Sequence, residues 1–381
     1  MHYFIGFLVA VESSLLLLDQ RFYWRSMITI GIFFAYAFSG FKYKLLREKI
    51  PNSLLILLVA FLLYFYINYD LFFTPQIYSR WGLTQQIYYL FSTPILVVIF
   101  LLILGSKRNH YLKEFIFSFS LTFAFLGFFL NIIDYHGTEN ENFLAVRFFL
   151  LIPILFIFVR SILGKILFFL ILFNIILYFN SRTILVISIF FIFLHIFRNL
   201  IFSSKKIFIS INFLACAALS IFPILFLLAF QEGSFLTGVF LSESKGVDGR
   251  FLIWAEILLE VTESNSILFG AGSNHDTLYY QSEFFGRNLS SHNMMLETVF
   301  RLGLVGYFLM IFSLFKLLNF CYTRKDSYSF QLGWISIICG MFLASLYEFI
   351  FFDGSGILNN IIFWFTLGTL FHAQDKNSDL S

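Results

Sequence analysis

Residues 248–307 read DGRFLIWAEILLEVTESNSILFGAGSNHDTLYYQSEFFGRNLSSHNMMLETVFRLGLVGY, and this stretch decides how the chain is organised. It is the only long polar segment in an otherwise apolar sequence, and its last residues run directly into a hydrophobic block. Apolar blocks long enough to cross a bilayer fill most of the chain around it. We therefore expect a membrane domain with one polar insertion.

The composition excludes a soluble globular domain. Hydrophobic residues make up 59% of the 381 residues, and charged residues make up 12%, whereas soluble chains carry roughly 25% charged residues. Lipid cannot satisfy backbone hydrogen bonds, so only helices and closed barrels span it. Barrel strands would appear as alternating segments of about ten residues, but the apolar blocks here are continuous. The sequence thus predicts an all-α polytopic membrane protein.

Hydropathy predicts about twelve transmembrane helices in a single membrane domain that covers residues 1–381. The expected spans are residues 3–18, 27–41, 52–68, 86–105, 114–133, 143–159, 166–179, 183–198, 207–230, 294–318, 331–349 and 357–372.

The distribution of lysine and arginine predicts the orientation. Basic residues recur in the loops on one side of the expected bundle, at 42–49, 107–113, 160–165, 198–206 and 324–325. Loops rich in lysine and arginine face the cytoplasm. We therefore expect both termini to be cytoplasmic, with a disordered tail at residues 373–381. The long loop, residues 231–293, is then extracytoplasmic, contains short helices and connects spans nine and ten.

The long loop contains a predicted helix, residues 249–263. Its apolar residues recur at helical spacing, and Trp254 is among them. Arg250 lies in the first turn, where a cation is unfavourable to the helix dipole, so helix stability does not explain it. Arg250 either binds a ligand or pairs with a loop carboxylate. Gly270 and Gly272 follow an apolar triplet, which indicates a tight turn or a close backbone approach.

His292 lies at the expected start of span ten, with Ser290 or Ser291 as the predicted cap. A helix N-terminus favours the neutral imidazole, which can accept a proton from a hydroxyl group. Asn293, Glu297 and Arg301 recur every four residues and share one helix face. A simple ion pair between Glu297 and Arg301 is the structural alternative. Gly303 and Gly306 are expected to permit close helix packing.

Two further arginines are candidates for binding a ligand. Arg147 lies five residues into the sixth expected span, and Arg182 follows Asn180-Ser181 and opens the eighth. Ionisable residues in spans are functional candidates by default. Both arginines lie near the outer ends of their spans, however, where a long side chain can reach the headgroup region.

Several kinds of site are not found in the sequence. It has no phosphate-binding loop, dinucleotide fingerprint, zinc-ligand spacing or Asp-x-Asp motif, and its three cysteines are isolated. We therefore expect no metal, no cofactor and no nucleic-acid partner.

Taken in order, the segments Asp248–Trp254, Leu268–Gly272, Ser291–Asn293, Glu297 and Gly303–Gly306 resemble the signature of the O-antigen ligase/polymerase superfamily. The resemblance is strong over about sixty residues and extends to the rest of the chain only by topology. Glu141 departs from the pattern, because members of the superfamily often have proline there.

The resemblance implies a glycosyltransferase of the GT-C type in the bacterial inner membrane. Its donor would be a polyprenyl-diphosphate-linked oligosaccharide, and a chain-length regulator and a flippase would be its partners, with membrane lipid around it. The implied catalytic residues are His292, Arg250 and Glu297. The implied binding residues are Arg182, Arg147, Asn293, Trp254, Gly270 and Gly272.

The resemblance implies two activities, and a transporter is the rival class. A polymerase would join repeat units to each other, and the Ser291–Glu297 segment with its closing Gly303–Gly306 is more similar to polymerases. A ligase would transfer finished polymer to the lipid A core. A flippase or transporter would carry ionisable residues near the bilayer midplane, and Glu12 is the feature that fits it.

Overall fold

The computed structural model describes four continuous stretches of the chain and a set of shorter pieces. The long stretches are residues 50–68, 182–229, 293–346 and 357–372. The shorter pieces are residues 42, 44, 101, 118, 121, 145–146, 149–150, 152–153, 156–157, 161–164, 166, 169–170, 173, 254, 257, 267–270, 280–282 and 287–289. The expected spans 3–18 and 27–41, most of spans 86–105, 114–133, 143–159 and 166–179, and the predicted tail lie outside these residues.

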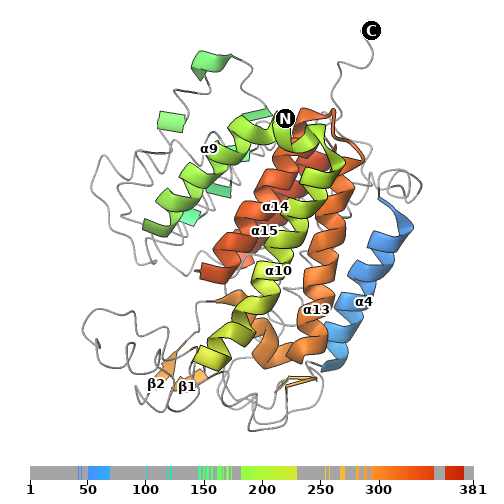
Figure 1. The fold of residues 1–381 in the computed structure, drawn as a ribbon, viewed down its shortest axis with the longest axis vertical. Coiled ribbons are helices and arrows are strands. Elements are labelled where there is room, and N and C mark those ends of the chain that lie inside the picture. The colour runs from blue at the N-terminus through green and yellow to red at the C-terminus, as the bar shows by residue number, and fades with distance from the viewer. Residues whose placement is uncertain are drawn as a thin grey trace.

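The described part of the chain is helical apart from one small hairpin (Figure 1). Its long helices are α4 (Asn52–Asn68), α9 (Arg182–Ser203), α10 (Lys205–Ala229), α13 (Met294–Tyr322), α14 (Tyr328–Leu346) and α15 (Ile357–His372). Strands β1 (Tyr280–Ser282) and β2 (Arg287–Leu289) pair antiparallel, with Tyr280 opposite Leu289. All six helices were predicted as spans, and α4 and α15 have the predicted bounds.

Three of these helices are long and apolar enough to cross a membrane, over Ile184–Ser203, Leu302–Tyr322 and Tyr328–Ser345. Their outward faces carry large apolar side chains that no protein covers; on α9 these include Ile189, Phe193 and Ile196. Exposed apolar faces of this kind are unfavourable in water and favourable in lipid. The described fold is that of a helical membrane protein.

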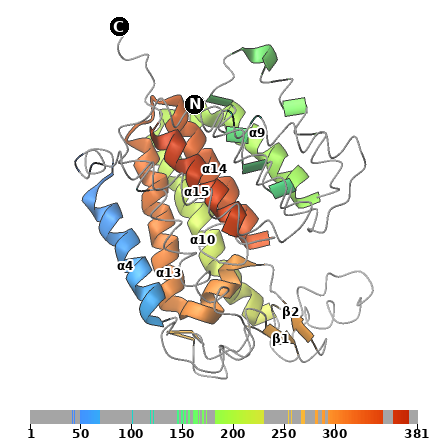
Figure 2. The same cartoon turned by 180° about the vertical axis from the view of Figure 1, so that it is seen from behind.

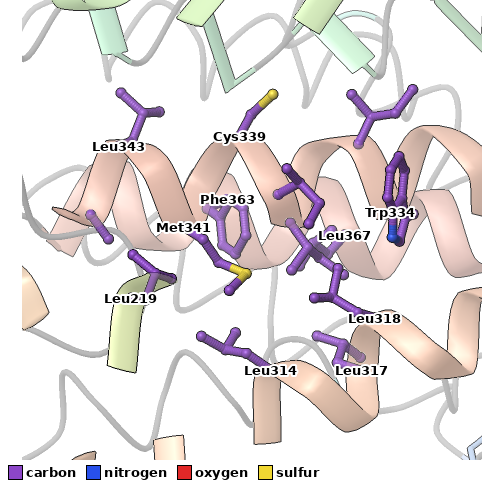
Figure 3. Close-up of a cluster of buried hydrophobic side chains, with 14 of the residues drawn as sticks. Leu219, Leu314, Leu317, Leu318, Trp334, Cys339, Met341, Leu343, Phe363 and Leu367 are labelled. Atoms are coloured by element: carbon purple, nitrogen blue, oxygen red, sulfur yellow. The ribbon is translucent and has the colours of Figure 1, made fainter. Parts of the chain in front are cut away.

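Helix α13 lies at the centre of the described bundle, in contact with α4, α10 and α14 (Figures 1 and 2). Helix α14 in turn contacts α9 and α15. The core between them is apolar, and Figure 3 shows five of its buried side chains, Leu314, Leu318, Met341, Phe363 and Leu367. Apolar side chains lie both on the buried faces and on the exposed faces of these helices, which explains why the helices show little apolar periodicity in sequence.

A buried polar network crosses this core. The indole N–H of Trp334 donates to Oδ1 of Asn212 at 2.7 Å, and the Asn212 amide donates to Oδ1 of Asn319 at 3.0 Å. Trp334 and Asn212 are fully buried. Because unpaired polar groups are costly away from water, the network fixes the relative register of α10, α13 and α14.

Four exposed basic residues gather at one end of the bundle. The α9–α10 and α13–α14 connections lie together at the upper end in Figure 1, and they carry the exposed residues Lys205, Lys206, Arg324 and Lys325. The β1–β2 hairpin lies at the lower end. The hairpin, which belongs to the polar stretch, therefore lies at the end opposite these four basic residues.

Candidate functional site

Helix α13 is interrupted at Gly303, which has φ 64° and ψ −173°. This conformation is accessible to glycine and strained for residues with a Cβ. The break separates an N-terminal arm, residues 294–302, from the remainder of α13. Close helix packing was the expected role of Gly303, and this expectation is wrong. Gly303 instead adopts the backbone conformation that interrupts the helix.

The 267–270 turn packs directly on this break. The amide of Leu304 donates to the carbonyl of Ile267 at 2.8 Å, and the amide of Val305 donates to the carbonyl of Leu268 at 3.1 Å. The first amides of a helix have no partner within it, and a break creates such a start inside α13. The turn therefore caps the second part of α13 with its backbone.

Gly270 completes this contact. Its φ is 81°, and its amide nitrogen would lie 2.5 Å from a Cβ added at Gly303. The prediction of a tight turn or a close backbone approach is confirmed for Gly270 on both counts. Gly272 lies outside the described residues.

Tyr64 of α4 reaches the same break from the other side. Its hydroxyl donates to the carbonyl of Leu302 at 2.8 Å, just before Gly303. A break in a helix withdraws intrahelical partners from the carbonyls that precede it, and a hydroxyl can replace them. Gly306 makes room for the ring, because a Cβ at Gly306 would lie 2.8 Å from Cε1 of Tyr64. Close helix packing at Gly306 is confirmed.

The N-terminal arm begins at Asn293, which is fully buried. Oδ1 of Asn293 accepts the amides of Met295 at 3.0 Å and Leu296 at 3.2 Å. The cap is therefore Asn293, and the predicted cap at Ser290 or Ser291 is wrong. A serine pair and an asparagine are comparable caps by sequence, and the helix start decides between them. The oxygen of this predicted binding residue is engaged in the cap.

The arm is enclosed by protein. Its described side chains are all buried: Met294, Met295, Leu296, Thr298, Val299, Phe300 and Leu302. The backbones of Glu297 and Arg301 lie in the helix one turn apart, which agrees with the predicted shared face. The structure does not describe their side chains, so the ion pair between them stays a prediction.

A proline and a tyrosine connect α13 to α10. Pro223 lies inside α10 and has no N–H to donate to the carbonyl of Leu219, four residues earlier. The hydroxyl of Tyr307, one turn beyond the Gly303 break, donates to that carbonyl at 2.5 Å. Tyr307 is buried, so this bond gives both its hydroxyl group and the Leu219 carbonyl a partner away from water.

Trp254, a predicted binding residue, is helical and only 4% exposed. Ile257, three residues later, is also helical and buried. Both observations agree with the predicted helix at residues 249–263, whose apolar face contains both residues. Trp254 is therefore covered by protein.

The remaining predicted site residues are only partly described. Arg182 is the first residue of α9, and the structure describes its backbone alone. Arg250, His292 and Arg147 lie outside the described residues. His292 is the residue immediately before the Asn293 cap in sequence.

A second polar cluster, which sequence reasoning missed, lies at the end of the bundle that carries the four exposed basic residues. Arg198 Nη1 donates to the carbonyl of His195 at 2.6 Å, and its guanidinium lies 5.2 Å from the ring centroid of Tyr328. The His195 ring is 5.1 Å from Phe156 and 5.9 Å from Tyr328, centroid to centroid. His195 and Arg198 are close in sequence, but Phe156 and Tyr328 come from distant segments, so no local pattern marks the cluster.

Within the residues that the structure describes, no group of three or more histidine, cysteine or acidic side chains lies close enough to hold a metal ion. Comparison with family models finds no match to this chain, and comparison with curated proteins finds none either. The candidate site consists of the Gly303 break, the 267–270 turn and the capped N-terminal arm.

Proposed function

We propose that this protein is a GT-C-type membrane glycosyltransferase that joins polyprenyl-diphosphate-linked oligosaccharide repeat units at the outer face of a bacterial inner membrane. The proposal includes about twelve spans with both termini in the cytoplasm. It rests on the resemblance to the O-antigen ligase/polymerase superfamily.

One observation supports the proposal most directly. The Leu268–Gly272 and Ser291–Gly306 parts of the resembling signature are distant in sequence, yet two backbone hydrogen bonds join the 267–270 turn to α13 at Gly303. Residues that act on one substrate have to be brought together in this way. The contact lies away from the four exposed lysine and arginine residues at the opposite end of the bundle.

The proposed reaction needs an acceptor hydroxyl and a leaving diphosphate. The hydroxyl oxygen attacks the anomeric carbon of the donor, the bond from that carbon to the diphosphate oxygen breaks, and polyprenyl diphosphate leaves with the electron pair. His292 would accept the hydroxyl proton. Arg250, with Arg182 and Arg147, would stabilise the leaving diphosphate, since guanidinium groups bind phosphate oxygens in a bidentate manner.

A ligase is the second candidate, because the resemblance covers both activities. The acceptor distinguishes them: it is another repeat unit for a polymerase and the lipid A core for a ligase. In a deletion strain, core capped with a single repeat unit is expected for a polymerase. Bare core with accumulated lipid-linked polymer would instead identify a ligase.

The direct test is transfer by the purified protein, reconstituted with purified lipid-linked repeat unit and followed by product length. We expect Arg250→Lys to lower the rate about ten- to hundredfold, because a point charge cannot replace a bidentate guanidinium. We expect His292→Gln to lower it about 10²- to 10⁴-fold. Arg324→Lys, an exposed change at the opposite end of the bundle, is the matched control.

Each outcome has a consequence for the mechanism. A near-normal rate for His292→Gln would show that His292 only positions substrate. A near-normal rate for Arg250→Lys at normal protein abundance would remove bidentate phosphate binding by Arg250. Movement of the lipid-linked donor across vesicles, without formation of a longer product, would support a flippase instead.

A further inference from the structure

The Gly303 break has a defined cause in the backbone. A Cβ added at Gly303 would lie 2.3 Å from the carbonyl oxygen of Leu268 and 2.5 Å from the amide nitrogen of Gly270. These are backbone atoms, which cannot move aside as a side chain can. Any residue other than glycine would therefore be strained at φ 64° and would also displace the 267–270 turn.

The break also divides α13 by length. The apolar span Leu302–Tyr322 has 21 residues, which at 1.5 Å per residue is about 31 Å and matches a hydrocarbon core of about 30 Å. The N-terminal arm precedes this span and is not needed to cross the bilayer. Its direction is consequently free to be set by other contacts.

Three contacts set that direction. Asn293 caps the first amides of the arm, Tyr64 holds the carbonyl of Leu302 at its end, and the 267–270 turn holds the first amides beyond the break. Only the turn contact requires glycine at 303. A helix of 29 residues without the break would continue straight and carry Glu297 and Arg301 elsewhere.

We infer that Gly303 is a positioning residue: it admits the 267–270 turn to the interior of α13 and so fixes the direction of the N-terminal arm, which carries Glu297 and Arg301. This inference rests on the proposed function for its effect on transfer. Gly303 acts through the arm and makes no contact with substrate.

The first experiment compares Gly303→Ala with Gly333→Ala. Gly333 is an equally crowded glycine, because a Cβ there would lie 2.3 Å from Cε1 of Phe371. It belongs to α14, however, and the atom it would meet is part of a movable ring of α15 and not of the backbone. We expect Gly303→Ala to lower kcat for transfer about a hundredfold with a smaller effect on KM, since misplacement by about 1 Å has this consequence. Gly333→Ala should lower thermal stability and leave kcat near wild type.

The second measurement needs no transferase activity. Cysteines introduced as Leu268→Cys and Val305→Cys occupy exposed positions joined by the 3.1 Å backbone bond, and the three natural cysteines are buried. A short thiol-to-thiol cross-linker should join the pair rapidly in the otherwise wild-type protein. We expect Gly303→Ala to slow this cross-linking at least about tenfold, and Gly333→Ala to leave it unchanged.

The cross-linked protein itself tests the inference where Gly303→Ala fails to fold. If the contact is part of the active arrangement, the cross-linked pair should transfer at the rate of the uncross-linked pair. Loss of transfer that is restored by reduction would overturn the inference, because the contact would then have to open in turnover.

The remaining outcomes separate the inference from the proposed function. Equal cross-linking rates in Gly303→Ala and wild type would overturn the role of Gly303 in holding the turn. Slow cross-linking with a normal kcat would overturn its role in positioning. Absence of transfer by wild type would contradict the proposed function, while the cross-linking rates would still decide whether Gly303 holds the turn.

Discussion

Tyr307 and Tyr64 act on carbonyl groups that the regular helix ladder cannot satisfy. Pro223 deprives the Leu219 carbonyl of its donor, and the Gly303 break interrupts the ladder after Leu302. Each carbonyl instead receives a tyrosine hydroxyl from a neighbouring helix. Backbone irregularities in a membrane domain persist only where the protein re-satisfies the groups they release. Each tyrosine therefore stabilises the fold in partnership with a particular irregularity.

The pairing of Tyr307 with Pro223 is testable by a double-mutant cycle. Tyr307→Phe leaves the buried Leu219 carbonyl without its donor, and we expect a loss of about 1–3 kcal/mol in unfolding free energy. Pro223→Ala restores an amide to α10, so the double variant should be less destabilised than the sum of the single changes. Unfolding in detergent measures all four proteins. Strict additivity would show that the hydroxyl does not compensate for the proline.

At the scale of the element, α13 combines two tasks that a straight helix cannot perform together. Its apolar part, Leu302–Tyr322, has the length of a membrane span. The N-terminal arm is buried by protein and carries the candidate residues Glu297 and Arg301. Because of the Gly303 break, the arm can take its own direction while the Leu302–Tyr322 part keeps the length of a membrane span.

The Asn293 cap can be separated from a role in binding substrate. Asn293→Ala removes the oxygen that accepts the Met295 and Leu296 amides, and we expect a loss of about 1 kcal/mol in stability. Asn293→Ser retains a capping oxygen, so its loss of stability should be only a few tenths of the loss caused by Asn293→Ala. The measurement is the thermal unfolding temperature of both variants in one detergent. Equal losses of stability for the serine and alanine variants would contradict the capping role. If the serine variant is stable, its transfer activity reports on the Asn293 amide group alone.

At the scale of the whole molecule, four exposed basic residues mark one end of the bundle. Lys205, Lys206, Arg324 and Lys325 lie at one end, and the hairpin lies at the other (Figures 1 and 2). The positive-inside rule predicts that the basic end faces the cytoplasm, and this orientation would place the Gly303 break in the outer half of the bundle.

Cysteine labelling in intact cells tests this orientation. A cysteine introduced at Ser244, in the long loop, should react with an impermeant thiol reagent added from outside. A cysteine at Ser204, in the α9–α10 connection, should react only after the membrane is permeabilised. The natural cysteines are buried and give a low background. The reverse pattern would invert the topology and would put the candidate site on the cytoplasmic side.

The sequence by itself determined the class of protein and the bounds of its long helices. Helices α4 and α15 have their predicted limits, and α10, α13 and α14 begin within a few residues of theirs. Apolar run length is a local property set by the thickness of the bilayer, so it can be counted along the chain. A tight turn at Gly270 was also predictable, because glycine after an apolar triplet marks one.

Only the tertiary structure decided what the glycines, tyrosines and buried asparagines do. Sequence spacing gave Gly303 and Gly306 the same role, yet one breaks α13 and the other admits the Tyr64 ring. The partners of these residues lie in segments that are distant in the chain: the 267–270 turn, α4 and α10. Hydrogen bonds between distant segments leave no local periodicity, because their donors and acceptors are brought together only when the helices pack.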